Sequence, residues 1–236
     1  MIQKKILGVI PARAGSKRLP GKNVKELAGK PLIQWTIEAA LGSGVLDDTI
    51  VSTDDADILE LSKTLGCEAP FLRPVNLAGD ESSSISVVLH ALDYFEQQGV
   101  VYEYIMLLQP TSPLRTAKHI SDSVSYLDQK NADAVISVCE MEHSPLWSNV
   151  LEDDCNMDSF LADEIKNKRS QDLPTHYRLN GALYLVNAKR LREEKSFLLS
   201  GNNFAFKMEQ NCSVDIDEYL DFVIAETIIK KEEQNA

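Results

Sequence analysis

The 236-residue sequence offers little from which a metal cage, a disulfide framework or a membrane anchor could be built. Its four cysteines (Cys67, Cys139, Cys155 and Cys212) are widely spaced, with no CxxC pair and no nearby histidine cluster, which argues against a zinc site and against disulfides. No apolar run is long enough to span a membrane, and the polar start MIQKK is unlike a signal peptide. We therefore predict a cytoplasmic chain with reduced thiols and no membrane partner.

Positive charge is also scarce. The chain has 24 Lys and Arg against 36 Asp and Glu, so its formal net charge is −12 and nucleic acid is not an expected partner. Fingerprints of the Walker A and GxGxxG types are absent. The four histidines show no triad or ligand spacing, so nothing indicates nucleophilic catalysis. At this length we expect residues 1–236 to form a single domain.

Against this acidic background, one short segment is strongly basic. An apolar run at 6–10 leads into PARAGSKRLPGKN at 11–23, which holds two glycines and the cations Arg13, Lys17, Arg18 and Lys22. Glycines let backbone amides approach a ligand, and the cations favour a highly anionic one such as a triphosphate. A solvated basic turn is the alternative, but the position after a first strand favours a ligand loop.

Strand and helix patterns alternate along the chain. Strands are predicted at 5–12, 48–55, the start of 104–115, 133–141, the start of 182–194 and 206–210. Helices are predicted at 31–44, 56–66, 85–97, 117–131, the end of 182–194 and 213–231. This alternation predicts an α/β fold, a mostly parallel sheet with helices on both faces.

The region 142–178 follows neither period. It holds Trp147, Phe160 and several aliphatic residues among clustered acidic ones, so we interpret it as an excursion from the core that needs a partner surface. A protruding flap in a dimer would supply that surface. A disordered segment is the alternative.

Three further clusters of polar residues follow predicted strands, where open α/β sheets bind ligands. The sequence LLQPTSPLR contains Gln109 and could serve a hydroxylated substrate or simply form turns. Arg73 and the serines at 82–84 could hold a base or ribose, or could only cap a helix. Asp215 and Asp217, two apart on a strand, would present both carboxylates to one Mg²⁺, although they also fit the first turn of a helix.

Five motifs in this order (IPARAGSKRLPGKN, LRPVNLAGDESSS, LLQPTSPLR, RLNGALY and SVDIDEYLD) resemble those of the acylneuraminate cytidylyltransferases, the CMP-sialic acid synthetase family. The resemblance covers nearly the whole chain. It implies a Rossmann-like nucleotidyltransferase that uses CTP and Mg²⁺ to activate a nonulosonic (sialic-type) acid, with release of pyrophosphate. It also implies a homodimer in which an inserted dimerisation subdomain, here at about 142–178, completes the partner's active site.

The resemblance further implies roles for individual residues. Those for the nucleotide are Arg13, Ser16, Lys22 and Asn23 at the phosphates and Arg73, Ser82 and Ser84 around cytidine. Those for the sugar are Gln109, Arg178, Asn180 and Tyr184. Asp215 and Asp217 would hold Mg²⁺, and the catalytic set would be Lys22, Arg13 and Asp217.

The chain departs from the family pattern after its HxPL turn. Members that use N-acetylneuraminate often carry a basic residue there, supplied by the partner subunit, whereas this chain has Trp147. An aromatic side chain suits a more apolar sugar such as legionaminate or pseudaminate. Arg169 is the candidate for the partner's other anchor. A 3-deoxy-manno-octulosonate or other sugar nucleotidyltransferase, or a non-enzymatic nucleotide-binding module, is the alternative.

Overall fold

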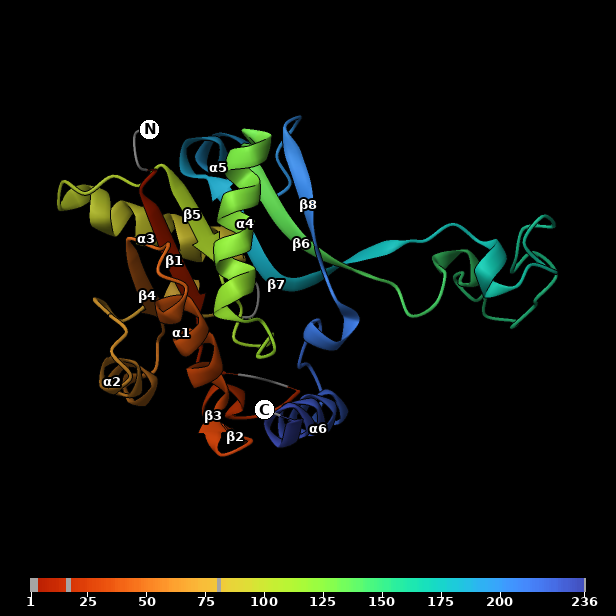
Figure 1. The fold of residues 1–236 in the computed structure, drawn as a ribbon, viewed down its shortest axis with the longest axis horizontal. Coiled ribbons are helices and arrows are strands. Elements are labelled where there is room, and N and C mark those ends of the chain that lie inside the picture. The colour runs from red at the N-terminus through yellow and green to blue at the C-terminus, as the bar shows by residue number, and fades with distance from the viewer. Residues whose placement is uncertain (1–3, 16–17, 80–81, 236) are drawn as a thin grey trace.

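A six-stranded sheet forms the centre of the computed structural model, which describes residues 4–15, 18–79 and 82–235 (Figure 1). The strand order is β4-β1-β5-β7-β6-β8. The strands are β1 (Ile6–Pro11), β4 (Asp48–Ser52), β5 (Tyr104–Leu107), β6 (Ala134–Glu140), β7 (Tyr177–Asn187) and β8 (Asn203–Met208). β1 is parallel to β4 and β5, and β6 to β8, while β7 runs antiparallel to both of its neighbours. The predicted, mostly parallel sheet is confirmed.

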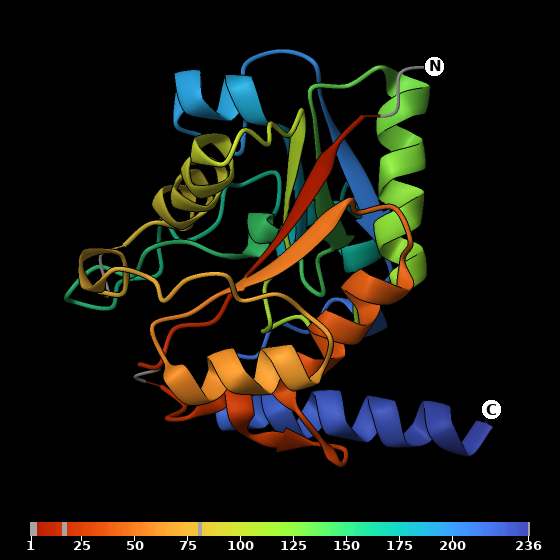
Figure 2. The same ribbon diagram turned by 90° about the vertical axis from the view of Figure 1, so that its left-hand side faces the viewer.

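Helices cover both faces of the sheet, as predicted (Figure 2). On one face lie α1 (Leu32–Gly42), α2 (Ala56–Thr64) and α4 (Ala117–Lys130), and on the other α3 (Ser84–Gln97) and α5 (Ala188–Glu194). The division begins in the sequence of β1, where Ile6 and Ile10 pack with the first group and Leu7 and Val9 with the second. Side chains that alternate across a strand explain why this segment is apolar throughout.

A third, smaller core lies below the sheet. The last helix, α6 (Tyr219–Asn235), packs against the hairpin of β2 (Glu26–Leu27) and β3 (Lys30–Pro31), with Leu27 and Phe222 in its buried cluster. The sequence predicted helix from Ser213, but residues 213–218 are neither helix nor strand. The Asp221 carboxylate accepts hydrogen bonds from the backbone N–H groups of Asp217 (3.0 Å) and Glu218 (2.8 Å), which ends the irregular segment and starts α6.

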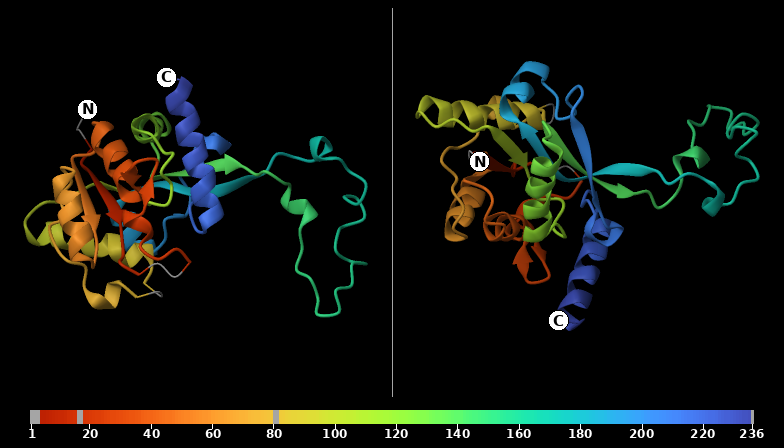
Figure 3. Two further views of the ribbon diagram at one scale, coloured as in Figure 1. Left: turned by 90° about the horizontal axis from the view of Figure 1, so that it is seen from below. Right: turned by 45° about the horizontal axis from the view of Figure 1, so that its top comes forward.

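The irregular region projects from the sheet as an excursion (residues 141–176), leaving between the ends of β6 and β7 (Figures 1 and 3). It contains two single turns of 3-10 helix, η3 (Pro145–Trp147) and η4 (Ser170–Asp172). β7 begins at Tyr177, earlier than predicted, because the β6 pairing continues out to Glu140 opposite Tyr177. β8 likewise begins at Asn203 because Ala134 of β6 already pairs there. In the part of the chain that the structure describes, no helix is both long and apolar enough to cross a membrane.

Candidate active site

A pocket of about 370 Å³ opens where β1 and β5 end, and it gathers residues from four separate sequence motifs. The predicted residues among its lining are Arg13, Lys22, Asn23, Arg73, Ser82, Ser84, Gln109, Asp215 and Asp217. Ser16, which was also predicted, lies outside the described residues. The structure therefore brings nearly all of the predicted nucleotide set together around one pocket.

The basic loop after β1 is held by its own backbone and by the end of β4. The N–H of Ala14 donates to Asp54 Oδ1 (2.9 Å), and the Asn23 amide donates to the carbonyl of Arg13 (3.0 Å). Gly21 has a φ of 65°, which a residue with a side chain adopts only at a cost. Asn23 is nearly buried, so besides lining the pocket it fixes the path of the loop that carries Arg13.

Lys22 begins the single turn η1 (Lys22–Val24) and lies against the irregular segment before α6. Its Nζ donates to the carbonyl of Ile216 (2.6 Å) and lies 3.7 Å from Asp217 Oδ1. Burial lowers the pKa of Lys22, and the neighbouring carboxylates of Asp217 and Asp215 oppose this effect. The result is a poorly hydrated ammonium at the wall of the pocket.

The two aspartates have different surroundings. Burial raises the pKa of Asp215, and a hydrogen bond from the Thr111 hydroxyl acts in the opposite direction. The Oδ1 atom of Asp215 is buried without a hydrogen-bond partner among the described residues. Asp217 is exposed and its Oδ2 pairs with Arg18 at 2.8 Å. Between them, Ile216 is fully buried, and its N–H donates to the carbonyl of Thr111 (2.8 Å). The pair thus meets at the pocket on an irregular segment, neither the strand nor the helix start that the sequence left open.

The donor set of these aspartates fits a hard divalent cation. Mg²⁺ prefers oxygen ligands, and here an uncompensated buried carboxylate oxygen lies beside a second carboxylate at the wall of the pocket. The sequence counted Arg18 among the loop cations but gave it no individual role, and here it pairs with Asp217. Its place in the basic loop was visible, but its contact with Asp217 joins positions far apart in the chain.

The wall formed by Arg73 and the serines is rigid. Arg73 is buried, its Nε donates to Ser52 Oγ (3.1 Å) and its Nη2 to the Ser52 carbonyl. Burial lowers the pKa of Arg73. Ser83 is the helix cap, because its Oγ accepts the N–H of Ser86 (3.1 Å). Ser82 and Ser84 on either side line the pocket, so the serine that caps the helix is not one of the two in the pocket lining.

The position of Gln109 depends on the buried Arg115, which bonds to its carbonyl, and on Gly181, which has no side chain to collide with it. Arg115 donates from Nη1 to the carbonyls of Gln109 (3.2 Å) and Ala182 (2.8 Å), which ties the loop to β7, and burial lowers its pKa to about 9. Gly181 has a φ of 74°, and a Cβ there would lie 2.8 Å from Gln109 Oε1. The register between β6 and β7 shifts beside this residue. Only glycine lets Gln109 reach its observed place.

The remaining predicted sugar residues do not line this pocket. Asn180 is buried and its amide donates to Ser213 Oγ (2.9 Å), so it joins β7 to the segment that carries Asp215. Arg178 pairs with Glu142 (2.9 Å) at the base of the excursion, and Tyr184 packs on Phe197 with ring centroids 5.3 Å apart. Two more residues, Trp147 and Arg169, lie out on the excursion, where Arg169 pairs with Asp172.

This arrangement suits displacement at phosphorus. Cations from the loop and two carboxylates line one cavity, and phosphoryl-type transfers need charge neutralisation and alignment more than a protein nucleophile. The pocket can therefore hold a nucleoside triphosphate and its counter-ion.

Comparison with known proteins gives several sequence relatives. A family model described as cytidylyltransferase matches residues 7–226. The CMP-N,N'-diacetyllegionaminic acid synthase of Legionella pneumophila is 37% identical over 96% of this chain and 97% of its own. The pseudaminic acid cytidylyltransferase of Campylobacter jejuni is 34% identical over 98% and 99%. The N-acylneuraminate cytidylyltransferase of Escherichia coli is 35% identical over 98% of this chain and 53% of its own.

Two solved structures share the architecture. A CMP:2-keto-3-deoxy-manno-octonic acid synthetase complexed with CTP aligns with a TM-score of 0.71 at 18% identity, over 97% of this chain and 100% of that one. The 4-diphosphocytidyl-2C-methyl-D-erythritol synthase of Anaerococcus prevotii aligns with a TM-score of 0.65 at 12% identity, over 96% and 99%. At these identities the likeness shows the fold alone, which is the α/β nucleotidyltransferase fold that the sequence predicted.

Proposed function

The chain belongs to the cytidylyltransferase family, as the resemblance predicted, and from this premise we propose that it transfers CMP from CTP to the anomeric hydroxyl of a nonulosonic acid. The sugar oxygen forms a bond to the α-phosphorus. The bond between the α-phosphorus and the oxygen that bridges it to the β-phosphate breaks, and pyrophosphate leaves. The observation that carries this proposal is the meeting of Lys22 and Arg13 with Asp215 and Asp217 in one pocket.

The cations divide the phosphate charge between them. Lys22 Nζ, already stripped of much of its water, would face the α-phosphate and the departing pyrophosphate, where negative charge grows. Arg13 offers a planar fork for bidentate phosphate contacts. Asp215 and Asp217 would hold Mg²⁺, which when bound supplies charge neutralisation and makes the attacking hydroxyl more acidic.

The wall of Arg73, Ser82 and Ser84 is proposed to receive cytidine. A buried guanidinium fixed on Ser52 is already oriented, so binding the nucleoside costs it little side-chain entropy. The serine hydroxyls can donate or accept, as the ribose and base edges require.

The sugar half of the site is proposed to form between two copies of the chain. Gln109 lines the pocket, whereas Tyr184 and Arg178 lie on β7 outside the pocket lining. Trp147 and Arg169 lie on the excursion, which also exposes Val150 (84%) and Leu151 (50%). Apolar residues on a projecting arm are typical of an interface. A second copy would bring Trp147 and Arg169 of its own excursion to this pocket.

Trp147 favours a sugar with apolar substituents. Legionaminate and pseudaminate carry deoxy and N-acyl groups, and relatives named for these two acids match nearly the full length of this chain. We therefore propose one of them ahead of N-acetylneuraminate.

The test is pyrophosphate release by the purified protein with CTP and Mg²⁺, in parallel with N-acetylneuraminate, legionaminate, pseudaminate and 3-deoxy-manno-octulosonate. We expect release that depends on legionaminate or pseudaminate. Release only with 3-deoxy-manno-octulosonate would assign the alternative sugar. No release with any acid, repeated with GTP, UTP and ATP, would leave a binding module and overturn the proposal.

A further inference from the structure

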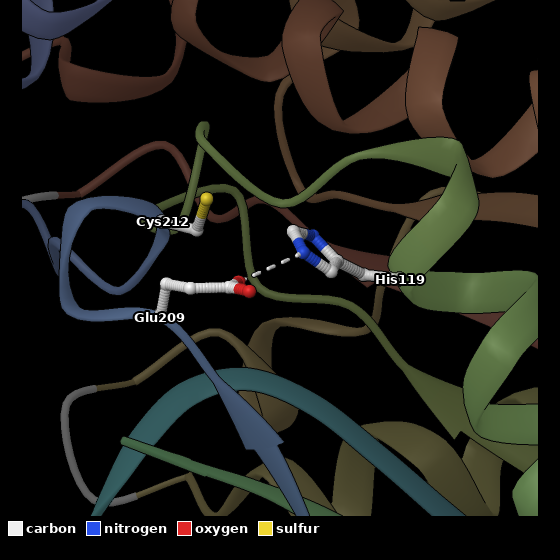
Figure 4. A group of neighbouring side chains, drawn as sticks. All are labelled: His119, Glu209 and Cys212. Atoms are coloured by element: carbon white, nitrogen blue, oxygen red, sulfur yellow. Dashed lines mark ion pairs between the residues drawn. The ribbon is translucent and has the colours of Figure 1, made fainter. Parts of the chain in front are cut away.

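A second group of metal-ligating side chains lies outside the nucleotide pocket. It consists of His119 on the first turn of α4 with Glu209 and Cys212 at the single turn η5 (Gln210–Cys212) (Figure 4). One ligand atom from each residue lies within 4.8 Å of the other two, and His119 Nε2 is 3.8 Å from Glu209 Oε2. None of the three lines the nucleotide pocket.

Local structure fixes two of the ligands on one side. Glu209 and Cys212 are three residues apart across η5, whose closing hydrogen bond runs from the Cys212 N–H to the Glu209 carbonyl (3.2 Å). Residues three apart across a 3-10 turn lie close together, so the turn brings the two side chains near each other. Figure 4 shows the Glu209 carboxylate reaching toward the His119 ring, with the Cys212 side chain nearby.

The histidine is held from the other side. His119 is the third residue of α4, and its ring Nδ1 lies 3.1 Å from the Thr116 N–H and 3.2 Å from Thr116 Oγ1 in a capping box. When Nε2 binds a metal, the ring proton moves to Nδ1, so Nδ1 no longer accepts from the Thr116 N–H and donates instead to Thr116 Oγ1 at 3.2 Å.

We propose that His119, Glu209 and Cys212 form a binding site for a borderline-soft divalent transition metal such as Zn²⁺. Imidazole nitrogen, thiolate sulfur and carboxylate oxygen are a ligand set that Zn²⁺ and Co²⁺ accept and that Mg²⁺ does not prefer. Three protein ligands leave a fourth position for water. Tetrahedral coordination needs the ligand atoms about 3.3–3.8 Å apart, given metal–ligand distances of about 2.0–2.3 Å, so only small side-chain rotations are required.

The position of this site gives it a structural consequence. His119 follows the loop that carries Gln109 and Thr111, and Cys212 precedes the segment that carries Asp215 and Asp217. These two segments already meet through the bond from the Ile216 N–H to the Thr111 carbonyl (2.8 Å). A metal held by His119 and Cys212 would add a second link between the two segments that wall the nucleotide pocket.

The experiment is a Co²⁺ titration of the untagged full-length protein, kept reduced with a phosphine and followed by absorption. We expect a thiolate-to-cobalt charge-transfer band that saturates at one equivalent per chain and survives excess Mg²⁺, since the Asp215 and Asp217 site has no sulfur. Cys212→Ser should abolish the band. Cys155→Ser, which removes the exposed cysteine of the excursion, is the matched control and should keep it.

Two further variants separate binding from folding. Glu209 is 74% exposed at its side chain, so Glu209→Gln should fold normally and weaken Co²⁺ binding about tenfold or more, and His119→Gln should do the same. Far-ultraviolet circular dichroism without metal checks the fold of each. No band in the wild type, a band that persists in Cys212→Ser, or equal affinity in Glu209→Gln would overturn the proposal.

Discussion

The nucleotide pocket and the excursion differ in how much of their contact surface one chain provides. The pocket walls are tied by short bonds between distant segments, such as Lys22 Nζ to the Ile216 carbonyl and Arg115 Nη1 to the Ala182 carbonyl. In the excursion, most hydrogen bonds are local, and Val150 and Met157 lie in solvent at 84% and 58% exposure. The described residues of one chain therefore form this pocket, whereas they leave apolar surface of the excursion uncovered.

The two regions therefore differ in where their rigidity comes from. A preorganised pocket stabilises developing charge without reorganising at each turnover. A projecting arm gains defined structure by packing on something else, because it buries too little apolar area alone. Mutations in the pocket should act on catalysis directly, and mutations in the excursion should act through assembly and sugar binding.

The largest effect is expected from Lys22→Ala. Removing the ammonium that we propose faces the reacting phosphates should lower kcat/KM by about 10³-fold, which is the upper range for one preorganised group at a developing charge. Pyrophosphate release with CTP and the preferred acid measures it. Lys63→Ala, an exposed lysine of α2 paired with Glu60, is the control and should keep full activity. Equal activity in both variants would remove Lys22 from catalysis.

Asp215→Asn should separate activity from stability. The amide removes a buried charge whose Oδ1 has no partner among the described residues, so the metal-free protein should gain about 1 kcal/mol of unfolding free energy. Activity should fall about 10²-fold, since Mg²⁺ loses a charged ligand. Chemical denaturation in EDTA and pyrophosphate release measure the two changes. A loss of stability together with the loss of activity would indicate a structural role instead.

Val150→Asp tests whether the excursion works through a second copy. A charge on this exposed residue should break self-association, seen as a fall from dimer to monomer mass in light scattering, and lower sugar-dependent turnover about 10²-fold. CTP binding, measured by calorimetry, should be unchanged because the nucleotide pocket belongs to one chain. Val101→Asp, at a residue 69% exposed between α3 and β5, is the control. A wild-type protein that is monomeric and fully active would rule out the shared site.

The features that could be predicted from the sequence are those whose residues are contiguous in the chain. The basic loop could be recognised because its glycines and cations lie together, and the sheet because apolar runs alternate with helical patterns. The direction of β7 could not, since a buried strand has the same apolar pattern in either orientation. The predicted start of α6 was also wrong, because Asp215 and Asp217 fit a strand and a helix start equally well.

Contacts between distant residues explain the rest of what was missed. The pairing of Arg18 with Asp217 and the turn of Asn180 toward Ser213 both depend on tertiary packing. The spacing of cysteines gave no sign of His119 beside Cys212 for the same reason. A single sequence carries the identities of such residues but not their proximity.

Gly181→Ala should show how tightly the pocket is built. The added methyl would lie 2.8 Å from Gln109 Oε1, and the φ of 74° is strained for alanine. We expect a loss of about 1–2 kcal/mol of stability and an activity about 10–30-fold lower, mostly through the KM for the sugar. Gly201→Ala is a matched control, because it has a φ of 69° but no atom within 4 Å of its Cβ. It should cost stability alone, and equal activity losses in the two would refute the steric role.

The smallest effect is expected from Trp147→Lys, which alters the excursion without changing the nucleotide pocket. Trp147 lies on η3, outside the pocket lining, so the KM for CTP should not change. Losing an apolar surface and gaining a cation should shift the ratio of kcat/KM between legionaminate or pseudaminate and N-acetylneuraminate by about tenfold toward the latter, the size that one pocket contact commonly supplies. Trp35→Phe, a change on α1 remote from the excursion, controls for loss of an indole. In heterodimers that pair Trp147→Lys chains with Lys22→Ala chains, the shifted preference should appear only if Trp147 acts on its own chain's pocket. In that mixture the active Lys22 pocket faces a native Trp147, so a wild-type preference there, with a shifted one in the Trp147→Lys homodimer, would place Trp147 at the other chain's site. A shifted preference in both assemblies would instead assign Trp147 to its own chain's pocket.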